Sequence, residues 1–221
     1  MMMVRIAGSA KKFIPMVRGS LSRVIRNVPE PLPVPIGKES SNHVRLLFAG
    51  RLDPVKGIEF LLNVLESLSH LYEFHLTVLG TGPSEKHLKA RFGKKKWVTF
   101  HGFVPGSEVT KTLIKCDLYC IPSLMAESYG LVTAQALQLG TPVIGSSIGG
   151  TTELVRNEIT GVLIPPGDEA AWRDAFSRIF TDRNLLACWH ENAVRHAQEF
   201  SEEAIGQAHE EFIEMLSRQS A

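Results

Sequence analysis

Short apolar runs alternate along this chain with helical stretches of about 10 to 15 residues, a pattern typical of βαβ units. Each run ends near a glycine, serine or proline, and the runs are VRLLFAG (44–50), FHLTVLG (74–80), WVTFHG (97–102), LYCIPS (118–123), PVIGS (142–146) and GVLIPP (161–166). Because the runs are apolar on both faces, they predict parallel strands joined by right-handed crossovers and covered by helices on both sides. We therefore expect an α/β fold, a doubly wound parallel sheet of the Rossmann-like type.

Residues 1–40 differ in composition from the rest of the chain. They carry seven lysines or arginines against only two acids, and the run VPEPLPVPIG within them holds four prolines. Prolines at this density prevent a regular helix and predict an extended connector. We divide the chain into a basic segment with a Pro-rich linker (1–40) and a Rossmann-like domain with C-terminal helices (41–221). A targeting segment is the alternative interpretation of the basic part.

The overall composition excludes several classes of protein. Twenty-four Lys and Arg residues nearly balance 23 Asp and Glu residues, for a net charge of +1, which argues against nucleic acid as a partner. Three cysteines are too few for a disulfide scaffold. No apolar stretch approaches the roughly 18 residues needed to cross a bilayer. We expect a cytoplasmic protein without a transmembrane segment, with peripheral membrane contact left open by the basic N-terminal segment.

Ligands of doubly wound sheets bind outside the carboxyl ends of the strands. The first loop at such an end is GRLDPVKG, in which Gly50 frees the backbone and Arg51 offers a planar fork for phosphate oxygens. Lys56 adds a positive charge at the start of the next helix, whose N-terminus favours anions. This loop is either an anion site or a solvated basic turn.

The second loop, VLGTGPSE, contains the start of a glycine-rich motif. Gly80 and Gly82 begin a G-x-G-x-x-G pattern, but Glu85 stands where the third glycine belongs. The loop also follows the second strand, whereas the dinucleotide fingerprint follows the first. We interpret it as a tight turn that brings backbone close to a ligand, and an NAD site as the disfavoured alternative.

Residues 122–155 hold the densest group of candidate site residues. Glu127 follows a predicted strand, and Gly130 lies at the expected start of a helix. The exposed amides of Gly130 and Leu131 would meet a phosphate. Gln135, one or two turns into that helix, could reach the same crevice.

Six segments together make residues 44 to 200 resemble the nucleotide-sugar-binding C-terminal domain of family 4 (group 1) glycosyltransferases, which have the GT-B fold. These segments are GRLDPVKG, VLGTGP, PS-x-x-x-ESYGLV, GTPVI, GGTTELV and TGVLIPPGD. The resemblance implies a retaining, hexosyltransferase-type enzyme that takes a sugar from a nucleoside-diphosphate sugar, with no other cofactor, to an unidentified acceptor. The sequence contains no D-x-D, which fits a metal-independent site where protein cations replace a divalent ion.

The resemblance also implies roles for individual residues. Arg51 and Lys56 match the family's diphosphate-binding pair, and Glu127 matches an acid that contacts the donor sugar's hydroxyls in relatives. The backbone of residues 101–103 matches the loop that brackets the base. The donor-binding residues expected from all the motifs are Gly50, Gly80, Gly102, Phe103, Gly130, Leu131 and Gln135.

The sequence departs from the family pattern in two respects. The second acid of the E-x7-E motif is replaced by Gln135, which keeps an acceptor oxygen but loses the charge, so each hydrogen bond to the ribose weakens by ~1 kcal/mol. Residues 1–40 cannot supply the acceptor domain of a GT-B enzyme. The chain thus looks like half an enzyme: an excised piece, a split subunit or a truncated product, whose partner is another chain or a missing N-terminal acceptor domain.

Other functions remain as alternatives. The main one is a non-catalytic nucleotide-sugar-binding module or a split subunit without an acceptor domain. An epimerase or phosphorylase would share the scaffold, and a glycoside hydrolase would need two carboxylates such as Glu127 and Glu153. Fold analogy does not separate these alternatives, because function depends on the site.

Overall fold

The structure is a computed structural model that describes residues 41–126 and 130–197, together with 5–6, 24–25, 206–207, 210–211 and 213–214. Most of the predicted N-terminal segment and linker lies outside the described residues. The described part of it is a parallel pair, β1 (Arg5–Ile6) and β2 (Val24–Ile25). The division into a linker and a domain at residue 40 therefore stays a prediction.

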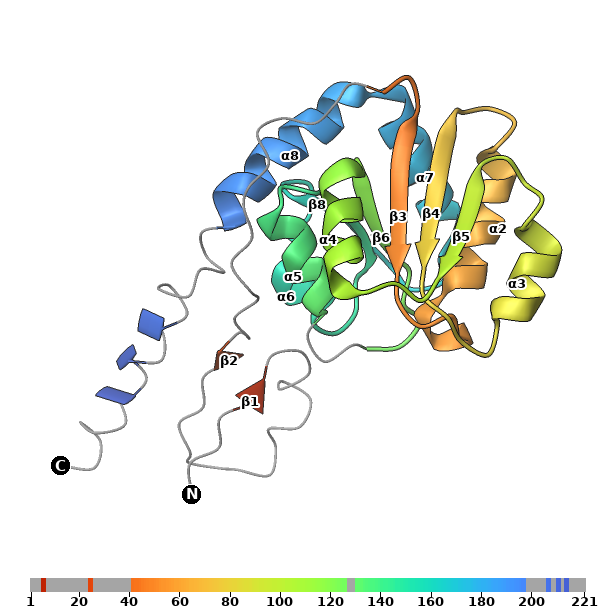
Figure 1. Cartoon of the computed structure of the whole chain (residues 1–221). Helices are drawn as coiled ribbons and strands as arrows, with labels where there is room; N and C mark the ends of the chain where they lie inside the picture. The colour runs from red at the N-terminus through yellow and green to blue at the C-terminus, as the bar shows by residue number, and fades with distance from the viewer. Residues whose placement is uncertain are drawn as a thin grey trace.

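Six parallel strands form the main sheet, in the order β5-β4-β3-β6-β7-β8 (Figure 1). Their bounds are β3 (Val44–Ala49), β4 (Phe74–Leu79), β5 (Val98–Gly102), β6 (Leu118–Ile121), β7 (Val143–Ser146) and β8 (Gly161–Ile164). Each of the six apolar runs contributes one strand, so the predicted doubly wound α/β fold is confirmed.

Helices cover both faces of this sheet, because successive strand residues point to opposite sides. On β3, Leu46 and Phe48 pack into one core cluster and Leu47 packs into the other. The first cluster is closed by α2 (Ile58–Leu68), α3 (Glu85–Phe92) and α7 (Glu169–Thr181), and the second by α4 (Gly106–Lys115), α5 (Leu131–Gln138) and α6 (Thr151–Leu154). The last described long helix, α8 (Arg183–Ala197), contributes Trp189 to the first cluster and Ala193 to the second.

None of the helices in the described part of the chain is long and apolar enough to span a lipid bilayer.

The order of the strands reverses beside β3. The chain lays β4 and then β5 on one side of β3, and returns to place β6 on the other side. In open α/β sheets the crevice that binds ligands forms at such a reversal, at the carboxyl ends of the two strands. The topology therefore places a ligand site between the loops that follow β3 and β6.

Backbone contacts join the loops at the carboxyl edge of the sheet. The Gly50 amide donates to the Leu79 carbonyl at 3.0 Å, and the Gly80 amide donates to the Gly102 carbonyl at 2.7 Å. Gly80 has a φ of +129°, and a Cβ there would lie 1.9 Å from the Gly50 carbonyl oxygen. The closest neighbour of Gly80 is thus another loop of the protein, and only glycine allows this approach.

We expect Gly80→Ala to lower the free energy of unfolding by about 2–4 kcal/mol, because the added methyl group meets fixed backbone at a positive φ. Urea unfolding followed by tryptophan fluorescence measures this change. Gly106→Ala is the matched control: nothing lies within 4 Å of a Cβ at Gly106, so its stability should stay the same or rise. Equal unfolding midpoints for the two variants would contradict the explanation.

Candidate functional site

Two adjoining pockets open at the carboxyl edge of the sheet. The larger pocket, of about 460 Å³, lies over the ends of β3, β4 and β5 and is lined mainly by glycine and apolar residues. The smaller one, of about 180 Å³, lies between the ends of β3 and β6, and we call it the switch-point pocket. The two pockets share four lining residues, Ala49, Gly50, Arg51 and Val132. A ligand with two chemically distinct parts could therefore occupy both.

The loop that carries the two predicted cations is held by a buried carboxylate. Asp53 is 4% exposed and caps a short 3-10 helix, η2 (Pro54–Lys56), by accepting the Lys56 amide at 3.1 Å. Its other carboxylate oxygen pairs with the Arg51 guanidinium. A capping acid before a helical turn that starts with proline is a common local combination. Asp53 therefore fixes where both cations lie, a role that the sequence analysis missed.

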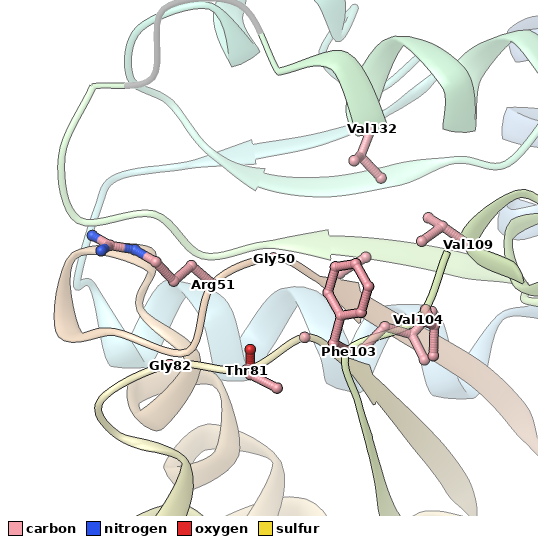
Figure 2. A pocket seen from close by; sticks show the side chains of 11 residues that line it. Gly50, Arg51, Thr81, Gly82, Phe103, Val104, Val109 and Val132 are labelled. Atoms are coloured by element: carbon pink, nitrogen blue, oxygen red, sulfur yellow. The ribbon is translucent and has the colours of Figure 1, made fainter. Parts of the chain in front are cut away.

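The structure brings both predicted cations to the switch-point pocket. Arg51 and Lys56 both line it, and Arg51 also lines the larger pocket. The Arg51 side chain is 68% exposed and points away from Phe103 (Figure 2). The fork of Arg51 is thus accessible to an anion while its charge is balanced by Asp53.

The larger pocket lies between an exposed aromatic ring and a helix. Phe103, 79% exposed, follows β5, and Val132 projects from α5 on the opposite side of the pocket (Figure 2). Val104 and Val109 add apolar surface, while Gly50 and Gly80 contribute backbone. A flat apolar group such as a nucleobase suits these walls, since aromatic rings and glycine backbone both favour close stacking. Gly102, also predicted to contact the base, precedes Phe103 without lining either pocket as described.

The N-terminus of α5 points at the switch-point pocket. Gly130 is the N-cap with a φ of +87°, as predicted for a helix start, and no side chain caps the helix there. Gly130, Val132 and Thr133 line the pocket, while the Leu131 side chain is exposed. An uncapped helix N-terminus offers backbone N–H groups and a positive dipole end to an anion.

Two predicted site residues are less directly placed. Glu127 lies outside the described residues. Gln135 is half-buried on α5, one turn beyond Val132, and it is not among the residues that line either pocket. Helical side chains lean toward the N-terminus of their helix, so a long side chain at this position extends toward Val132.

A cysteine at the base of the switch-point pocket is chemically inert. Cys120 lines the pocket but is fully buried, and burial, aided by nearby Cys116, raises the pKa of its thiol well above the usual value. The thiolate is the reactive form of cysteine. Cys120 is therefore a packing residue and no nucleophile at neutral pH.

Among the described residues, no three histidine, cysteine, aspartate or glutamate side chains lie close enough to share a metal ion. The charged groups that line the two pockets in this part of the chain are Arg51 and Lys56. The switch-point pocket, which both cations line, therefore favours anions.

The residues of the switch-point pocket that were not singled out from the sequence include Ser123, Val132 and Thr133. The position of Ser123, directly after a strand, was the available signal. For Val132 and Thr133 the available signal was the predicted helix start at Gly130. Both residues lie in the first turn of that helix, beside its N-terminus.

Comparison with known proteins identifies relatives. Residues 35–196 match the model of the family "Glycosyl transferases group 1". An uncharacterized glycosyltransferase of Methanocaldococcus jannaschii is 33% identical over 142 residues, which cover 62% of this chain and 36% of that protein. The D-inositol 3-phosphate glycosyltransferase of Salinispora arenicola is 32% identical over 167 residues, 70% of this chain and 37% of that protein. The chain thus spans little more than a third of these relatives.

A solved structure shares the fold. The HepE protein of Anabaena, crystallised in complex with UDP, superposes with a TM-score of 0.79 at 24% sequence identity. The superposition covers 96% of this chain and 64% of HepE. Together, the family match and the six-stranded parallel sheet show that the chain belongs to the group 1 glycosyl transferases and has the fold of their C-terminal GT-B domain.

Proposed function

We propose that this chain binds the donor of a glycosyl transfer, a nucleoside-diphosphate sugar, with its base in the larger pocket and its diphosphate in the switch-point pocket. The observation that carries the proposal is the convergence of Arg51, Lys56 and the uncapped N-terminus of α5 on one small pocket at the strand-order reversal. Family membership supports it, and so does the complex of HepE with UDP.

The proposed reaction places the positive charges where negative charge develops. As the sugar leaves, charge accumulates on the departing diphosphate, and Arg51, Lys56 and the amides of Gly130 and Leu131 stabilise it as it forms. These groups do the work of a divalent cation, so the transfer is metal-independent in this proposal. In this proposal Glu127 holds the hydroxyls of the sugar, and the anomeric configuration is retained.

The acceptor comes from elsewhere in this proposal, on a second domain or a partner chain. Two of the curated relatives are named D-inositol 3-phosphate glycosyltransferase and phosphatidyl-myo-inositol mannosyltransferase. We propose only that the acceptor approaches the sugar from the open side of the two pockets, because the carboxyl edge of the sheet is where the donor lies.

A non-catalytic donor-binding module is the second candidate, and Gln135 is the observation that favours it. A transferase in the presence of its partner domain converts the donor to nucleoside diphosphate, whereas a binding module does not. Release of UDP from UDP-sugars, measured with and without candidate partner chains, separates the two functions.

Lys56→Ala should weaken binding of UDP by about tenfold and of uridine by less than about twofold, because charge-assisted hydrogen bonds contribute about 1.5–3 kcal/mol and only the diphosphate carries the matching charge. Calorimetric titration with and without EDTA measures both affinities, and EDTA should change neither. If UDP does not bind, the same titration is run with GDP and ADP.

Lys94→Ala is the matched control for this prediction. Lys94 is exposed and lines neither pocket, so the control removes the same charge from a distant surface. Equal losses for UDP and uridine in the Lys56 variant, or equal losses in both variants, would refute the assignment of Lys56 to the diphosphate.

Gln135→Glu should tighten UDP binding by about fivefold, the equivalent of ~1 kcal/mol for restoring a charged acceptor to the ribose hydroxyls. Inorganic pyrophosphate is the control ligand, because it lacks a ribose and should bind no more tightly to the variant. Titrations of both ligands measure the effect. An unchanged UDP affinity would show that residue 135 does not contact the nucleotide.

A further inference from the structure

A buried hydroxyl in the switch-point pocket has no hydrogen-bond partner. Thr133 is 0% exposed and lines this pocket, and its Oγ1 makes no hydrogen bond within the part of the chain that the structure describes. Buried polar side chains are nearly always hydrogen-bonded, so an unpaired one calls for a specific explanation. Here a ligand that enters the pocket can supply the missing hydrogen-bond partner.

Other threonines of this chain show how such hydroxyls are normally satisfied. On helices, Thr112 and Thr181 donate to the carbonyls of Glu108 and Ser177, each at 2.7 Å, which is the usual bond to a residue four positions earlier. The buried Thr141 donates to the Leu113 carbonyl at 2.8 Å. Thr133 departs from this behaviour.

The hydroxyl of Thr133 lies at the first turn of α5, beside the N-cap. Its Oγ1 would be 3.1 Å from a Cβ built on Gly130. The Gly130 carbonyl is already bonded to the Ala134 amide at 3.1 Å. A threonine side chain in a helix is restricted to two main χ1 rotamers, so few arrangements of the hydroxyl compete with the one seen here.

The chemistry of the surrounding pocket determines what this hydroxyl can bind. Arginine, lysine and backbone N–H groups are donors without acceptor capacity, so Arg51, Lys56 and the start of α5 offer the Thr133 hydrogen no acceptor. A phosphate supplies anionic oxygens that accept from all of these donors at once. We propose that the Thr133 hydroxyl is a ligand of the donor's diphosphate, donating a hydrogen bond to a phosphate oxygen at the N-terminus of α5.

This assignment rests on the proposed function and adds a neutral donor to its two cations. The hydroxyl contributes direction, since one O–H bond points one way, whereas Lys56 contributes mainly charge. The Thr133 hydroxyl also lowers the stability of the ligand-free protein, because a buried hydroxyl without a partner destabilises the fold. Binding and stability should therefore respond in opposite directions when the hydroxyl is removed.

The experiment compares Thr133→Val, which replaces the hydroxyl with a methyl group of similar size, and Thr133→Ser, which keeps the hydroxyl, in the full-length chain. Thr181→Val is the matched control, because Thr181 is exposed and bonded within α7. UDP, inorganic pyrophosphate and uridine are titrated by calorimetry, and thermal unfolding is recorded without ligand.

Thr133→Val should bind UDP and pyrophosphate about tenfold more weakly, which is the usual effect of losing a hydrogen bond to a charged group. Its affinity for uridine should stay within about twofold and its Tm should stay equal or rise, whereas a merely structural role would lower the Tm. Thr133→Ser should retain UDP affinity within about threefold of wild type. Thr181→Val should bind all three ligands normally.

Normal binding of UDP and pyrophosphate by Thr133→Val would overturn the inference about Thr133 and leave the proposed function intact. The inference would also be overturned if Thr133→Val bound uridine and UDP more weakly by the same factor and had a lower Tm. If the wild-type chain binds pyrophosphate but no nucleotide, the proposed function fails while the comparison of variants still decides the role of Thr133. If it binds neither pyrophosphate nor any of UDP, GDP and ADP, both proposals fall.

Discussion

Contact between backbones at the carboxyl edge of the sheet is the constraint on which the site depends. The loops after β3, β4 and β5 are tied by the amides of Gly50 and Gly80, and the loop after β6 is tied to the first of them by a bond from the Leu124 amide to the Val55 carbonyl at 2.9 Å. These bonds use no side chain of the pockets, and the last of them crosses the strand-order reversal.

The electrostatic arrangement follows from this frame. Asp53 is buried under the first loop, so its charge serves the fold by capping η2 and pairing with Arg51. The opposite wall is the N-terminus of α5, which is positive without carrying a charged residue. Under the proposed function, the Asp53 cap and the helix start hold positive groups at the pocket before a ligand arrives, and such preorganisation favours both binding and stabilisation of developing charge.

The fold was predictable from the sequence, and so was the position of several candidate residues at one edge of the sheet. Six apolar runs specify six strands because parallel strands are buried on both faces, and Gly130 marks the start of α5 because few other residues adopt its backbone conformation. The motif that contains Arg51 and Lys56 correctly placed both residues beside one pocket, because the topology brings the carboxyl ends of the strands together.

Asp53 and Thr133 were missed. The burial of Asp53, and the lack of a hydrogen-bond partner for Thr133, arise from tertiary packing, which no local pattern encodes. The sequence identified Gln135 as a departure from the family pattern. Whether Gln135 reaches either pocket could not be predicted, because that depends on the direction of its side chain.

The two pockets differ in chemistry and meet along a narrow common wall. Substitutions at Val104, Val109 or Phe103 reshape the apolar compartment without touching the cations, the Asp53 cap or the start of α5. Under the proposed function, such a division would let the wall around the nucleobase change while the groups around the diphosphate stay the same.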